Sequence, residues 1–143
     1  MKLYFDSAYV AKFYLMEPDS RAVRNLAEKA EELHSSEWCL AEMACALHRQ
    51  VREGTLTPRE AAEVRRSFRA HAADGDWVLT PVTRELLEEV DAVVRTLSTE
   101  TFLRAGDALH LVSARAAGFS EIWTNDRHLL RAARHFGLKG RSV

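Results

Sequence analysis

The sequence predicts a single α/β domain of three layers, in which helices cover both faces of a small central parallel sheet of four to five strands. Short apolar segments alternate with longer amphipathic segments, which is the pattern of parallel strands joined by helices. The length of 143 residues suits one domain, and no repeat, low-complexity segment or linker divides residues 1–143. Hydrophobic residues make up 47% of the chain and charged residues 29%, so a sizeable apolar core can form.

In the first half of the chain, the limits of the elements follow from apolar runs and from residues that stop helices. Pro18 ends the first helix, because the residue before a proline avoids helical geometry, and Gly54 marks the end of a longer one. The expected elements are a strand over 2–5, helices over 8–15 and 20–32, a brief strand over 33–35 and a helix over 36–52.

The second half opens with a strong helix start. Thr57 is a capping residue, Pro58 occupies the first helical position, and Glu60 follows three residues after the threonine. The expected elements are helices over 57–73, 83–97, 108–117 and 127–135, strands over 77–80 and 121–124, and a short edge strand after Gly137.

Composition argues against several classes of protein. No stretch approaches the roughly 20 apolar residues of a membrane helix, and the N-terminal apolar run is too short for a signal peptide. We therefore expect a cytoplasmic protein that has no membrane partner. Cys39 and Cys45 fall on different faces of one expected helix, which argues against a disulfide and against a zinc site. We expect both cysteines to be buried as small apolar side chains.

Four acidic residues form the candidate site. Asp6 and Asp126 each follow a strand, so both should lie at the carboxyl edge of the sheet, where ligands bind in open α/β folds. Asp107 opens a helix that leads back to this edge, and Glu42 lies among small and apolar helical residues. Each acid alone is explained as a helix cap, a dipole partner or a surface group. Together, carboxylates at one edge repel one another unless a cation neutralises them, and oxygen ligands favour Mg²⁺ or Mn²⁺.

A divalent cation held by carboxylates suits phosphodiester hydrolysis, because it activates water and binds the scissile phosphate. Motifs for nucleotide binding or for a serine nucleophile are missing. A phosphatase with an aspartyl nucleophile needs a second acid where the chain has Ala8. The alternative from a different class is a non-catalytic acidic-pocket binding module. A receiver-like module would need an acceptor aspartate on a central strand, and the strand over 77–80 has none.

Three segments resemble a known family, and they occur in that family's order. They are YFDSAYVAKFYLMEPDS at residues 4–20, LAEMACALHRQVREGTLT at 40–57 and GDALHLVSARAAGFSEIWTNDRHLLRAARHFGL at 106–138. The chain resembles PIN domains, and within them the VapC-type toxin ribonucleases of toxin–antitoxin pairs. The last segment is the most specific, because D-A-L-H and T-N-D-x-x-L follow a matching D-S-A start.

The resemblance implies a PIN-like fold in which the four acids bind Mg²⁺ or Mn²⁺ and activate water for endonucleolytic cleavage of RNA. Asp6 and Asp107 would bind the metal most directly. The other two acids would bind it directly, bind it through water or orient the nucleophile. Ser7 and Thr124 match positions where small hydroxyl residues support the acids, although helix capping and strand-end hydrogen bonding explain them equally well.

The resemblance also implies a homodimer and a cognate antitoxin, which inserts an arginine or lysine among the acids. The aromatic segment from Tyr9 to Leu15 is a candidate groove for an antitoxin helix, but it also suits the core, and we expect a mixture of the two. The runner-up function is a PIN-type nuclease that acts in RNA processing outside toxin–antitoxin pairs.

An acidic site needs basic neighbours to hold RNA. The formal net charge is -1, yet residues 127–143 carry five basic side chains and no acid. Arg127, Arg131 and Arg134 are therefore the best RNA-binding candidates, although they also suit the solvent face of a helix. A second basic stripe follows residues 59–69.

Two further polar residues lie near the acids in sequence. His110 follows Asp107 by one helical turn and is a candidate general base. Its apolar neighbours favour a packed histidine with one satisfied nitrogen. Asn125 suits either a substrate contact or a turn.

Overall fold

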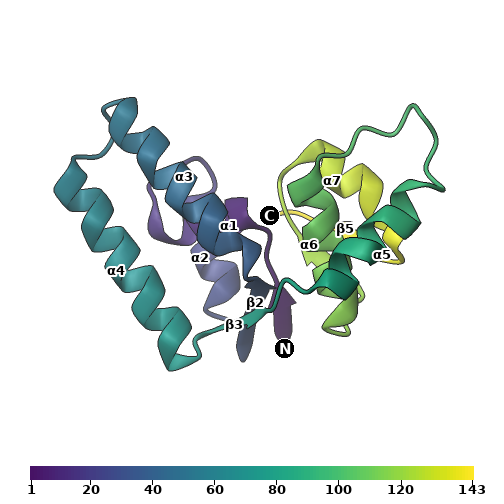
Figure 1. Cartoon of the computed structure of the whole chain (residues 1–143). Coiled ribbons are helices and arrows are strands. Elements are labelled where there is room, and N and C mark those ends of the chain that lie inside the picture. The colour runs from purple at the N-terminus through teal and green to yellow at the C-terminus, as the bar shows by residue number, and fades with distance from the viewer.

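The computed structural model describes residues 1–143 and contains five short parallel strands, three of which form a sheet between two groups of helices (Figure 1). Strands β1 (Lys2–Tyr4), β2 (Glu32–Ser36) and β3 (Trp77–Thr80) form one sheet with β2 in its centre. Strands β4 (Glu121–Trp123) and β5 (Lys139–Arg141) form a second parallel pair, and the bridge between Phe5 and Trp123 joins the two sheets. The predicted α/β class with four to five parallel strands is confirmed.

The helices divide into an N-terminal and a C-terminal group, which lie on opposite sides of the strands in Figure 1. The N-terminal group comprises α1 (Ser7–Tyr14), α2 (Ser20–Ala27), α3 (Trp38–Arg52) and α4 (Pro58–Asp74). The C-terminal group comprises α5 (Arg84–Val94), α6 (Ala105–Ala116), α7 (Arg127–Ala132) and the 3-10 turn η1 (Ala133–Phe136). No helix combines the length and the apolar character that a membrane span requires.

Each face of the sheet packs against a separate apolar core. Leu3 and Phe5 point into a cluster built from the N-terminal helices, whereas Tyr4 points into a cluster built from α5, α6 and α7. Successive residues of a strand face opposite sides, so β1 contributes to both cores. The carboxyl end of β1 therefore lies where the two helical groups meet.

The structure changes several boundaries, among them the start of α6, which lies at Ala105 rather than at 108. The helix expected over 20–32 ends at Ala27, because Glu32 already begins β2, which pairs with a strand on each side. The helix expected over 83–97 ends at Val94. The capping box of Thr57 and Glu60 forms as predicted, with each side chain accepting from the other residue's backbone N–H.

One expectation about burial also changes. The expectation that both cysteines are buried is wrong for Cys45, which is exposed. The buried stripe of α3 runs through Cys39, Met43 and Leu47, and position 45 lies off this stripe. In the early aromatic segment, Tyr9 and Leu15 are buried in the N-terminal core, while Phe13 and Tyr14 pack against that core and are only partly buried.

Candidate active site

Thr124 connects Asp6 with Asp126 at the carboxyl ends of neighbouring strands. Asp6 caps α1 by accepting a hydrogen bond from the backbone N–H of Tyr9 at 2.9 Å. Its other carboxylate oxygen accepts a hydrogen bond from the hydroxyl of Thr124. The same hydroxyl oxygen accepts from the backbone N–H of Asp126 at 3.0 Å, and Asp126 in turn caps α7. The two acids therefore lie on one sheet edge, as their positions after strands predict.

His110 connects Glu42 with the segment that carries Asp6. Its Nε2 lies 2.7 Å from Oγ of Ser7 and 3.2 Å from Oε1 of Glu42, while its Nδ1 lies 3.2 Å from the hydroxyl of Tyr4. The imidazole is buried, as expected for a packed histidine, but both of its nitrogens have partners rather than one. His110 thus draws α3, α6 and the start of α1 together.

Arg104 connects Asp107 with Asp126. Its Nε donates to Oδ2 of Asp107 at 3.0 Å, and a terminal guanidinium nitrogen donates to Oδ2 of Asp126 at 2.8 Å. The sequence pattern did not predict Arg104 as a site residue. A detectable signal was present, because Arg104 precedes Asp107 by three residues at a helix start, and side chains at that spacing meet.

The close approach of α6 to α3 depends on Gly106. A Cβ atom at this position would lie 3.0 Å from Nε1 of Trp38 and 3.3 Å from Oε1 of Glu42. Both distances are tighter than ordinary contacts, so a side chain here would displace Glu42 or the indole. The glycine before Asp107 therefore helps to hold Glu42 near the other acids.

Burial makes the acid site unfavourable for negative charge. Burial raises the pKa of Asp6 to about 6, although His110, Thr124 and the backbone of Tyr9 lower it. Asp6 is only 4% exposed, and the charge of Glu42 raises its pKa further. A cation beside these oxygens would relieve both effects.

The donor chemistry suits a hard divalent cation, because every acidic side chain in the site presents oxygen. The guanidinium of Arg104 already lies between two of the carboxylates, where a positive charge is favoured. In this arrangement no three acidic, histidine or cysteine side chains converge on one point that would hold a metal. The oxygen donors of the site thus suit a cation in their chemistry, although they do not converge on one point. The guanidinium of Arg104 provides the counter-charge in this arrangement.

The side chain of Asn125 is held by hydrogen bonds within the chain. Its Oδ1 accepts a hydrogen bond from the hydroxyl of Tyr9 at 2.7 Å, and its Nδ2 donates to Asp19 at 3.0 Å. Both ends of the side-chain amide are therefore hydrogen-bonded to residues near the start of the chain.

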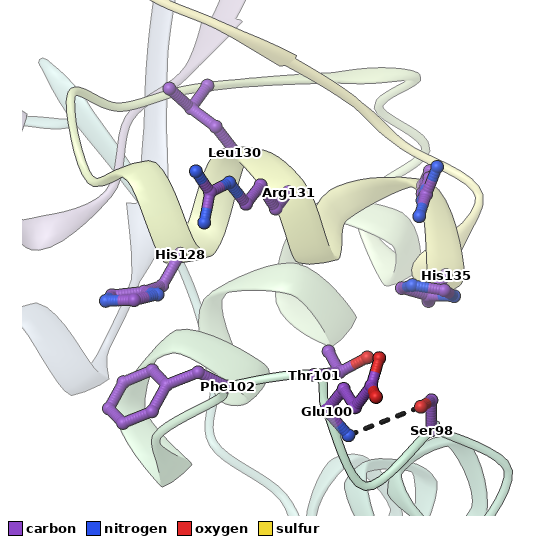
Figure 2. A pocket seen from close by; sticks show the side chains of 9 residues that line it. Ser98, Glu100, Thr101, Phe102, His128, Leu130, Arg131 and His135 are labelled. Atoms are coloured by element: carbon purple, nitrogen blue, oxygen red, sulfur yellow. Dashed lines mark hydrogen bonds between the residues drawn. The ribbon is translucent and has the colours of Figure 1, made fainter.

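The predicted RNA-binding arginines are exposed along α7 and η1. Arg131 and Arg134 line a hollow together with Phe102 and His128, whereas Arg127 does not (Figure 2). The alternative basic stripe lies on α4, which is at the opposite side of the molecule from α7 (Figure 1).

Comparison with known proteins is consistent with this architecture. The PIN domain family model matches residues 3–135. The structure of Mycobacterium tuberculosis VapC20, described as a sarcin–ricin loop cleaving toxin, is similar with a TM-score of 0.69 and 19% identity, covering 91% of this chain and 94% of the other. A chain of FitAB bound to an IR36 DNA fragment is similar with a TM-score of 0.63 and 13% identity, covering 99% of this chain and 94% of the other. No curated protein matches at the level of sequence. Because the family model spans most of its length, the chain belongs to the PIN domain family.

Proposed function

We propose that this protein is a cytoplasmic, metal-dependent endoribonuclease and the toxin of a type II toxin–antitoxin pair. One observation carries the proposal. Four acids from separate segments are connected at one sheet edge by Thr124, His110 and Arg104. Membership of the PIN domain family and the likeness to a sarcin–ricin loop cleaving toxin support a nuclease.

Asp6, Glu42, Asp107 and Asp126 would hold Mg²⁺ or Mn²⁺, with Asp6 and Asp107 as the most direct ligands. A divalent cation bound there would supply water activation and charge neutralisation at the scissile phosphate. The chain's own groups prepare this site: Thr124 fixes one carboxylate oxygen of Asp6, and His110 fixes one of Glu42. Ser7 supports the acids indirectly, through His110.

Arg104 occupies Oδ2 of both Asp107 and Asp126, so it has to release them before these two oxygens can turn toward a metal. Its side chain is 61% exposed, so it can swing away without disturbing the core. The same geometry supports an antitoxin partner, because these acids already accept a guanidinium. We propose that an antitoxin places a basic side chain there, and that the protein acts as a homodimer.

The test is cleavage of RNA by the wild-type protein and by Asp6→Asn, in Mg²⁺ or Mn²⁺ and in chelator. We expect endonucleolytic cuts by the wild type with metal, and none in chelator or by the variant. Equal cleavage by Asp6→Asn would sink the metal-nuclease proposal. Absence of cleavage by a metal-loaded wild type would instead favour the non-catalytic acidic-pocket module.

Toxicity is tested separately from catalysis. We expect brief induction of the wild type to stop growth and to produce discrete cuts in total RNA. We expect co-expression of a short DNA-binding protein encoded by a neighbouring gene to restore growth. Cleavage in vitro with no growth arrest would favour the alternative of a PIN-type nuclease in RNA processing.

A further inference from the structure

A hollow of about 720 Å³ lies beside the acid site, between residues 98–102 and the α7–η1 segment. Figure 2 shows Phe102 on one wall and His128 and Arg131 on the other, with His135 at the far end. Its lining is mostly polar. The mechanism proposed above uses none of these side chains.

Resting on the proposed nuclease function, we propose that this hollow binds single-stranded RNA next to the cleavage site. One base would stack at the pair formed by Phe102 and His128, and Arg131 and Arg134 would bind the flanking phosphates. The occupant is a single strand, because a base in a duplex is already stacked and is unavailable to a protein ring.

The aromatic pair provides the first support. Phe102 is 53% exposed, and its ring centroid lies 4.3 Å from that of His128, with the ring planes inclined by 42°. An exposed phenylalanine contributes little to the core, but a ring held by a neighbour is ready to stack on a base of any sequence.

The charges provide the second support. Arg131 and Arg134 are exposed and form no ion pair, whereas Arg104, Arg115 and Arg141 in the same half of the chain are each paired with an acid. Glu100 is the only acid in the lining. Free guanidinium groups are suited to phosphate, which they bind through several N–H donors.

Continuity with the acids provides the third support. The backbone N–H of His128 donates to Oδ1 of Asp126 at 2.8 Å, and Phe102 precedes Arg104 by two residues. Both walls of the hollow therefore lead directly to residues of the acid site. A strand seated in the hollow would present its next phosphodiester to the acids.

The experiment measures fluorescence anisotropy of labelled, randomised short single-stranded RNA with the full-length protein in chelator, so that no cleavage occurs. We expect Phe102→Ala to weaken binding about tenfold or more, with little change in salt dependence. We expect Arg131→Gln/Arg134→Gln to weaken it by a similar factor and to reduce the slope of log K against log salt by about 1.4, since each phosphate contributes about 0.7.

Matched variants separate these effects from general damage. Phe102→Tyr keeps a ring and should bind like the wild type. Arg66→Gln/Arg69→Gln removes two exposed arginines with the same three-residue spacing on α4, and it should leave affinity unchanged. All substituted positions are exposed, and thermal unfolding of each variant checks the fold.

Wild-type RNA affinity in both Phe102→Ala and Arg131→Gln/Arg134→Gln would overturn the proposal. Equal weakening of RNA binding by Arg66→Gln/Arg69→Gln would also overturn it. Parallel cleavage assays with Mg²⁺ separate it from the nuclease function. Binding that depends on Phe102 in a protein that never cleaves RNA would remove the nuclease and leave the hollow as an RNA site. Cleavage that does not depend on Phe102, Arg131 or Arg134 would retain the nuclease function and overturn the assignment of the hollow as an RNA site.

Discussion

The acid site and the hollow lie side by side but are built in opposite ways. In the acid site each carboxylate has a partner within the chain, and Asp6, its partner Thr124 and the adjacent Ser7 are buried. In the hollow, Phe102, Arg131 and Arg134 are exposed, and the two arginines are unpaired. Groups that would meet the reacting atoms therefore have fixed positions, because preorganisation has its largest effect there. Exposed groups can adapt to RNA of varied sequence.

The largest expected effect comes from removing a charge in the fixed region. Glu42→Gln keeps an acceptor oxygen for His110 but removes a candidate metal ligand, so we expect at least about a 100-fold loss of single-turnover RNA cleavage. Glu53→Gln, at the exposed end of the same helix, is the control and should cleave at the wild-type rate. Equal rates for the two variants would place Glu42 outside the site.

Asp6→Asn is expected to stabilise the protein while it abolishes cleavage. The folded-state pKa of Asp6, about 6, lies above its ordinary value of 3.8, so ionisation disfavours the fold. The penalty is absent below about pH 4, grows as the pH rises and is complete above about pH 6. Removing the charge should raise the free energy of unfolding by up to about 3 kcal/mol near pH 7.5, as measured with urea. A loss of stability at that pH would contradict the assigned cause.

His110→Phe is expected to destabilise the fold by about 1–3 kcal/mol, because the buried hydroxyls of Tyr4 and Ser7 lose a partner. Urea unfolding measures the change. His48→Phe, on the exposed side of α3, is the matched control and should change stability little. If both variants unfold alike, His110 is a packing residue and does not organise the site.

The smallest expected effect concerns the border between the two regions. Arg104→Gln removes the internal counter-charge of Asp107 and Asp126, and we expect Mn²⁺ to bind roughly 3- to 10-fold more tightly. The midpoint of Mn²⁺-dependent thermal stabilisation measures this affinity. Arg95→Gln, which breaks an exposed pair with Asp91, should leave it unchanged. Weaker Mn²⁺ binding in Arg104→Gln would show that the arginine supports the metal site rather than competing with it.

Local sequence signals predicted much of the fold and part of the site. Capping at Thr57 and strand ends before Asp6 and Asp126 depend on near neighbours in the chain, so they can be recognised directly. The grouping of Asp6 with Asp126 follows, because parallel strands end at one edge.

The remaining features depend on contacts between distant segments. Tyr4 meets His110 across 106 residues, and Arg104 meets Asp126 across 22. No local pattern encodes such contacts, and the same holds for the hollow, whose aromatic wall comes from an irregular segment. The exposure of Cys45 could not be predicted for a related reason: helical periodicity reveals an apolar stripe, but packing decides which residues at its border are buried.

The most direct test of the central claim is calorimetric titration of the wild-type protein and Asp6→Asn with Mn²⁺. If the acids form a cation site, the wild type binds Mn²⁺ saturably and releases protons when the pH is near 6, whereas Asp6→Asn shows neither effect. Equal Mn²⁺ binding by the two proteins, or no saturable binding by the wild type, would contradict the assignment of this sheet edge as a metal-dependent catalytic site.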